Sequence, residues 1–205
     1  MNDSKEKKIM NSQAKRKKIE TITTAAMMTA LVIVFQCIAT YTTFFGPFST
    51  AIGLIPIIIG AALCGPTIGA WLGLVFGIVV LATGGANLFF AFDVPGTLIT
   101  VLVKGMACGF AAGMVNKLLK RFNKTVAAIT AAIVCPIVNT GIFLLGGLIF
   151  FMPHAEAIAA IVQLEASGFS VFLALATANF LFELGMSIVL SPVIVRVLDI
   201  IKKDK

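Results

Sequence analysis

The sequence predicts an all-α membrane protein with six transmembrane helices and both termini in the cytoplasm. Of its 205 residues, 59% are hydrophobic and only 12% are charged, and its mean hydropathy is +1.04. A soluble domain of this size needs far more polar surface. The apolar residues also form six runs that are separated by short connections, and most charged residues lie outside these runs.

Basic residues define the predicted orientation of the six runs. Of the 16 Lys and Arg residues, seven precede residue 20, four lie within 117–124 and four follow residue 195. The connections that alternate with these clusters contain none, as expected when basic segments remain in the cytoplasm. We therefore expect a cytoplasmic basic tail over 1–20, a six-helix domain over 21–199 and a cytoplasmic tail over 200–205. The protein is expected in the cell membrane, without a nucleic-acid partner.

The first half of the chain divides into three apolar runs at glycine-proline pairs. The first run, 21–40, follows the basic tail without a small-residue cleavage site, so it is predicted to be a retained membrane helix. Gly46-Pro47 and Gly65-Pro66 mark turns before and after a short helix over 51–64. The third predicted helix covers 67–83.

The second half of the chain begins with an irregular segment at 84–93. The helix predicted over 94–116 is long enough to cross a bilayer, which takes about 20 mostly apolar residues. After the basic connection, a helix is expected over 126–151 and a short surface helix within 154–167. The last predicted helix covers 169–198.

Two of the predicted helices carry glycine at every fourth position. Small residues at this spacing form a flat helix face and let two backbones approach closely in lipid. We expect both faces to pack inside the bundle. They consist of Gly69, Gly73 and Gly77 on one helix and Gly105, Gly109 and Gly113 on another.

A cation lies near the middle of the fourth predicted helix. Lys104 is about 14 Å from the outer end of this helix at 1.5 Å per residue, where an ammonium costs about 2.5–3.5 kcal/mol on insertion scales. Asn139 and Asn179 are expected at a similar depth on the next two helices, and Glu183 one turn deeper. Such residues need a polar cavity, a partner, or both.

Two interpretations of these polar residues are compatible with the sequence. In the first, Glu183 neutralises Lys104, and the two asparagines hold helices together. In the second, the ammonium faces a water-filled cavity and binds the anionic group of a small solute, with Glu183 orienting Lys104. Gln36 would close this cavity from above. Asn87 belongs to an outer connection with three phenylalanines, which is either a lid or an interfacial aromatic belt. The candidate substrate-binding residues are Lys104, Asn139, Asn179, Glu183, Gln36 and Asn87.

Enzymatic motifs do not accompany these residues. The four cysteines lack metal-ligand spacing, His154 is the only histidine, and no phosphate-binding loop occurs. We expect neither catalysis nor a metal or cofactor. Lys104 and Glu183 could serve as an acid and a base, but no nucleophile is paired with them. A stand-alone secondary transporter stays an alternative, although the two halves lack the matching broken helices of that class.

Several segments in a fixed order resemble the substrate-binding S components of energy-coupling factor (ECF) vitamin transporters. They are the Ala26-x-x-x-Ala30 face on the first helix, the run Ile55–Pro66, the run Cys135–Gly141 and the run Leu190–Arg196. The resemblance covers nearly the whole chain after residue 20 and is closest to the pantothenate-type branch.

This resemblance implies a role and a set of partners. An S component binds a water-soluble vitamin near the outer face and has no catalytic activity of its own. It docks through its first helix, here Ala26 and Ala30, onto a transmembrane coupling subunit that two cytoplasmic ATPases drive. Pantothenate carries one carboxylate, which suits Lys104. The riboflavin, folate and cobalamin S components share the scaffold and are the alternatives.

Overall fold

The computed structural model describes residues 3–41 and 50–203, and every regular element in this part of the chain is a helix. The predicted turn at Gly46-Pro47 lies outside the described residues. The elements, in order, are α1 (Asp3–Tyr41), α2 (Thr50–Cys64), α3 (Pro66–Ala82), α4 (Asn87–Phe90), α5 (Val94–Leu119), α6 (Lys124–Gly146), a π-helical turn (Gly147–Phe151), a 3-10 turn (Met152–His154), α7 (Ala155–Ile161) and α8 (Phe169–Lys203).

Four segments of the described chain are long and apolar enough to cross a membrane. They lie in α1, in α5, in the stretch from α6 to the end of α7, and in α8. The helices α2 and α3 are apolar but have only 15 and 17 residues. At 1.5 Å per residue, 17 residues extend about 25 Å, which is less than the hydrocarbon core of about 30 Å. The prediction of an all-α membrane protein is confirmed, whereas helix length alone does not establish six spans.

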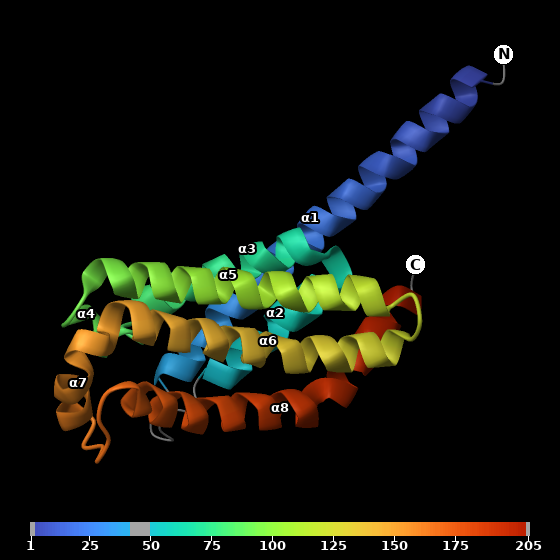
Figure 1. Cartoon of the computed structure of the whole chain (residues 1–205). Coiled ribbons are helices and arrows are strands. Elements are labelled where there is room, and N and C mark those ends of the chain that lie inside the picture. Colours follow the sequence, from blue (N-terminus) through green and yellow to red (C-terminus); the bar gives the residue numbers. More distant parts are fainter. Residues whose placement is uncertain (1–2, 42–49, 204–205) are drawn as a thin grey trace.

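Most predicted helices agree with the structure, and the main difference is at the N-terminus. The helix α1 begins at Asp3, so the basic segment predicted as a tail continues the first helix. Lys, Arg, Glu and Gln are good helix formers, and this part of α1 projects away from the bundle (Figure 1). The short surface helix expected within 154–167 is α7.

The bundle has two distinct ends. The helices α5, α6 and α8 run side by side, with α4 and α7 at one end, which we call the capped end (Figure 1). The connection from α5 to α6 lies at the opposite end, near the C-terminus. We call this the basic end, because the connection contains Lys117, Lys120, Arg121 and Lys124.

The two glycine faces were predicted to pack inside the bundle, and they meet each other between α3 and α5. A Cβ atom added to Gly73 would overlap the backbone carbonyl oxygen of Gly105, and one added to Gly69 would overlap that of Gly109. A Cβ on Gly77 would lie 3.0 Å from the carbonyl oxygen of Val101. The backbones of α3 and α5 are therefore in direct contact, which places α5 firmly in the bundle.

A methyl group in this contact is expected to destabilise the fold. Gly73→Ala should lower the free energy of unfolding by about 1–3 kcal/mol, the usual cost of overpacking. Gly141→Ala is the matched control, because nothing lies within 4 Å of a Cβ at Gly141 in α6. Thermal unfolding of both purified variants in detergent measures the difference. An equal loss of stability in the two variants would contradict the contact.

Two apolar clusters form the interior. The larger cluster joins α2, α3 and α5 through residues such as Ile57, Phe76 and Cys108. The smaller cluster contains Phe151 and Phe172, and it lies between α7, α8 and the π-helical turn at the capped end.

Candidate substrate-binding site

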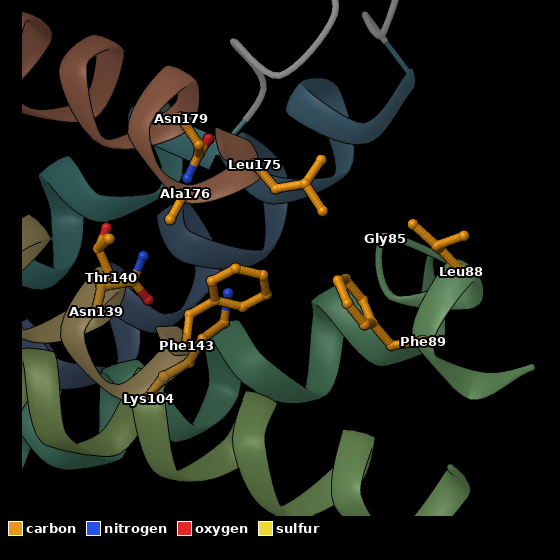
Figure 2. Close-up of a pocket in the computed structure, with 10 residues that line it drawn as sticks. All are labelled: Gly85, Leu88, Phe89, Lys104, Asn139, Thr140, Phe143, Leu175, Ala176 and Asn179. Carbon is orange, nitrogen blue, oxygen red and sulfur yellow. The ribbon is translucent and has the colours of Figure 1, made fainter. Parts of the chain in front are cut away.

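A cavity of about 270 Å³ opens between α5, α6 and α8. This volume is slightly below the range of about 300–1,000 Å³ that is usual for small-molecule sites. The turn before α4 and α4 itself form the remaining wall, so the cavity faces the capped end (Figure 2). Its lining residues are Gly85, Leu88, Phe89, Lys104, Asn139, Thr140, Phe143, Leu175, Ala176 and Asn179.

Lys104 brings a positive charge into the cavity wall. It lies within α5, and its side chain is half-buried. The Nζ atom lies 5.7 Å from the centroid of the Phe143 ring on α6 (Figure 2), which is within cation–π distance. The opposite charge of Glu183 acts on the same amine. The amine thus has an aromatic ring and a carboxylate nearby and still borders the cavity.

Glu183 is held by two asparagines behind the cavity wall. Its side chain is fully buried and accepts hydrogen bonds from Asn139 Nδ2, at 3.3 and 3.2 Å to its two oxygens. Asn179 Nδ2, one turn earlier on α8, donates to Oε1 at 2.8 Å. A buried carboxylate needs such donors. Asn139 therefore joins α6 to α8 at Glu183, whereas the contact between Asn179 and Glu183 lies within α8.

The other end of the Asn139 amide is left without a partner. Asn139 is only 2% exposed, and its Oδ1 atom has no hydrogen-bond partner among the described residues. Because Nδ2 points to Glu183, Oδ1 is the acceptor that this side chain presents elsewhere. An unsatisfied buried acceptor costs about 1–3 kcal/mol. This unsatisfied acceptor thus belongs to a residue that borders the cavity together with Lys104.

Aromatic side chains close the apolar side of the cavity. The Phe89 ring from α4 meets the Phe143 ring edge-on at a centroid distance of 5.5 Å, and it lies 5.0 Å from the Phe151 ring. Leu88, Phe89 and Leu175 also pack against the smaller apolar cluster. At least one phenylalanine of the outer connection therefore turns inward and contributes to the cavity wall.

The connection around α4 is attached to the bundle at two further places. Asp93 caps α5, because its Oδ1 accepts a hydrogen bond of 3.0 Å from the Gly96 backbone N–H. The Phe92 ring lies 5.4 Å from the imidazole of His154. These contacts hold the segment over the cavity.

The structure brings together four of the six predicted site residues. Lys104, Asn139 and Asn179 border one cavity, and Glu183 lies directly behind the two asparagines. This agrees with the depths expected from the sequence. The remaining two, Gln36 and Asn87, do not belong to the wall of this cavity.

Gln36 and Asn87 have other surroundings. Gln36 is 2% exposed, its Nε2 donates to Thr40 Oγ1 at 3.4 Å, and its Oε1 would lie 2.7 Å from a Cβ on Gly53. It therefore packs between α1 and α2. Asn87 is exposed at the start of α4. Substrate contact by either residue stays a prediction.

Several residues that line the cavity were not predicted. Their helical spacing from the predicted asparagines could have identified two of them. Phe143 lies four residues after Asn139, and Leu175 lies four residues before Asn179. Side chains at i and i+4 share a helix face. Each asparagine thus identifies an apolar neighbour in the wall.

The predicted docking residues lie on the outside of the bundle. Ala26 and Ala30 are exposed on α1, whereas Ala25 and Met28 are buried. Beside them, a groove of about 470 Å³ runs between α1 and α3 and includes Ala26 and the half-exposed Trp71. The small residues therefore form part of an open surface and are not used for packing within the bundle.

An apolar helical bundle with a small cavity lined by a cation and amides has the features of a solute-binding membrane protein. The chain belongs to the family of ECF transporter substrate-specific components, whose family model matches residues 20–195. It is therefore a multi-pass membrane protein that binds a transported substrate and is not an enzyme. The family also implies a water-soluble substrate and interaction with an ECF module. Searches of curated proteins and of solved structures give no match.

Proposed function

We propose that the chain is the high-affinity substrate-binding subunit of an ECF-type ABC importer for a carboxylate-bearing vitamin such as pantothenate. Family membership supports the role of the subunit. The main support for an anionic substrate is that Lys104 lies in the wall of a solute-sized cavity. An ammonium inside a membrane bundle marks a functional site by default.

The proposed topology has six spans and both termini in the cytoplasm. The helices α2 and α3 would be the two short spans, since a bilayer thins locally around short apolar helices at modest cost. The basic end would face the cytoplasm. The capped end, with the cavity beneath it, would then face outward, where a vitamin arrives.

Pantothenate complements the chemistry of the cavity. Its carboxylate would pair with Lys104 in a charge-assisted hydrogen bond, and its hydroxyl or amide N–H groups would donate to Asn139 Oδ1. Its dimethyl group would pack against Phe89 and Phe143. Cobalamin is far larger than a cavity of about 270 Å³, and riboflavin has no carboxylate for Lys104. Folate has carboxylates but a bulkier, flat ring system.

The proposed partners are a transmembrane coupling subunit and two cytoplasmic ATPases. The sequence contains no phosphate-binding loop, so the energy of ATP hydrolysis would come from those subunits. The exposed Ala26 and Ala30 on α1 would meet the coupling subunit. Small side chains there would allow helices of the two proteins to approach closely.

Calorimetric titration of the purified full chain tests the substrate. We expect tight binding of pantothenate and at least 10-fold weaker binding of pantothenol, which replaces the carboxylate with an alcohol. Mass spectrometry of any co-purifying small molecule is an independent readout. Tight binding of riboflavin would contradict the anionic substrate. If no water-soluble vitamin binds and an ion gradient drives uptake without nucleotide, the chain is a secondary transporter instead.

A further inference from the structure

A second cavity, of about 360 Å³, lies at the basic end of the bundle, away from the candidate substrate site. The turn from α2 to α3 forms one wall, and the last turns of α5 form the other. Its lining includes Gly65, Pro66, Thr67, Asn116, Lys117 and Lys120. The two lysines are exposed, so the cavity is open to the positively charged surface of this end.

The N-terminus of α3 supplies one wall with hydrogen-bond donors. Gly65 is the N-cap of this 17-residue helix, with no side-chain cap, and its φ of 95° is one that glycine adopts readily. Pro66, the first residue of the helix, has no backbone N–H, so the donors without a partner within the helix are the N–H groups of Thr67 and Ile68.

The C-terminal part of α5 is pressed against this helix end. A Cβ on Gly113 would lie 2.6 Å from the Cα atom of Pro66. Asn116, Lys117 and Lys120 follow Gly113 at three, four and seven residues, so they lie on the same face of α5. The glycine contact therefore directs an amide and two ammonium groups toward the uncapped start of α3.

Asn116 is an independent indication that a ligand binds here. Its side chain is only 4% exposed and borders the cavity. The described residues provide its amide with no hydrogen-bond partner. Buried side-chain amides are nearly always paired. A group that enters the cavity would supply the missing partner.

We propose that this cavity binds a phosphate group, carried by the head group of an anionic lipid. A phosphate has enough acceptor oxygens to pair with the N–H groups of α3, the Asn116 amide and the two lysines at once. The basic end of a membrane bundle lies where anionic head groups gather, and basic pockets between helices there bind them. The proposal does not depend on the identity of the transported vitamin.

Lipid-dependent thermal stability of the delipidated full chain in detergent tests the site. Phosphatidylglycerol should raise the melting temperature of the wild type more than phosphatidylcholine does. We expect this difference to disappear in the double variant K117Q/K120Q. The matched control is R121Q/K124Q, which removes the same charge from the same connection outside the cavity wall. This control should keep the full effect of phosphatidylglycerol.

Two further measurements make the result decisive. Asn116→Leu keeps both lysines but removes the amide. Because the amide is proposed to contact the phosphate, this variant should weaken the effect of phosphatidylglycerol at least several-fold. Inorganic phosphate is the second probe. If it stabilises the wild type while phosphatidylglycerol does not, the site takes a soluble phosphate and the lipid source is wrong. Equal losses in the two double variants, or no response to either probe, would overturn the site.

Discussion

Replacing Lys104 with methionine is expected to weaken pantothenate binding by about 10- to 150-fold, or about 1.5–3 kcal/mol. Methionine has nearly the length of lysine and fills the same space beside Phe143, but it cannot donate a charge-assisted hydrogen bond. The loss of affinity should therefore come only from the missing contact with the carboxylate of the vitamin. Titration of the purified variant with pantothenate and with pantothenol measures it.

The comparison of the two ligands separates recognition from folding. Lys104→Met should bind pantothenol about as well as the wild type does, because the alcohol has no charge to lose. A variant that binds both ligands more weakly to the same degree would assign Lys104 a structural role with Glu183. Lys124→Met is the matched control. It removes one positive charge at the basic end, outside the lining of the substrate cavity.

Substitution of Ala26 and Ala30 by tryptophan is expected to abolish vitamin uptake and to leave vitamin binding intact. Both alanines are exposed on α1, and neither borders the substrate cavity. A large indole would keep the backbone of α1 away from a partner helix without disturbing the bundle. Uptake by cells that contain the complete transporter measures transport, and co-purification of the coupling subunit measures docking.

Leu31→Trp is the matched control for docking. Leu31 is 39% exposed on α1, but it lies about 100° around the helix from Ala30, since each residue turns the helix by that angle. This variant should dock and transport normally. Retained uptake in the double alanine variant would refute a contact through this face. Lost vitamin binding in that variant would show that the face supports the bundle itself.

The candidate site illustrates why the depth of a residue in the bundle is easier to predict than the direction in which its side chain points. Depth along a helix follows from a residue count, so Lys104, Asn139 and Asn179 were expected at one level and do border one cavity. Direction depends on how each helix is rotated against its neighbours. Gln36 was also expected near the cavity, but α1 turns this side chain toward α2. Asn87 belongs to a connection that borders the cavity, yet its own side chain is exposed.

The sequence by itself determined the class of the protein, most helix positions and the packing of the glycine faces inside the bundle. These features depend on local composition and spacing, because apolar runs partition into lipid and small residues allow close helix contacts. Only the tertiary structure decided which polar atoms of each side chain have a hydrogen-bond partner. The Asn139 amide joins Glu183 on one side and leaves an acceptor on the other. Similarly, the contact of Gly113 with Pro66 creates a cavity that no single segment encodes. Such features arise from the rotation and approach of helices that are distant in the sequence.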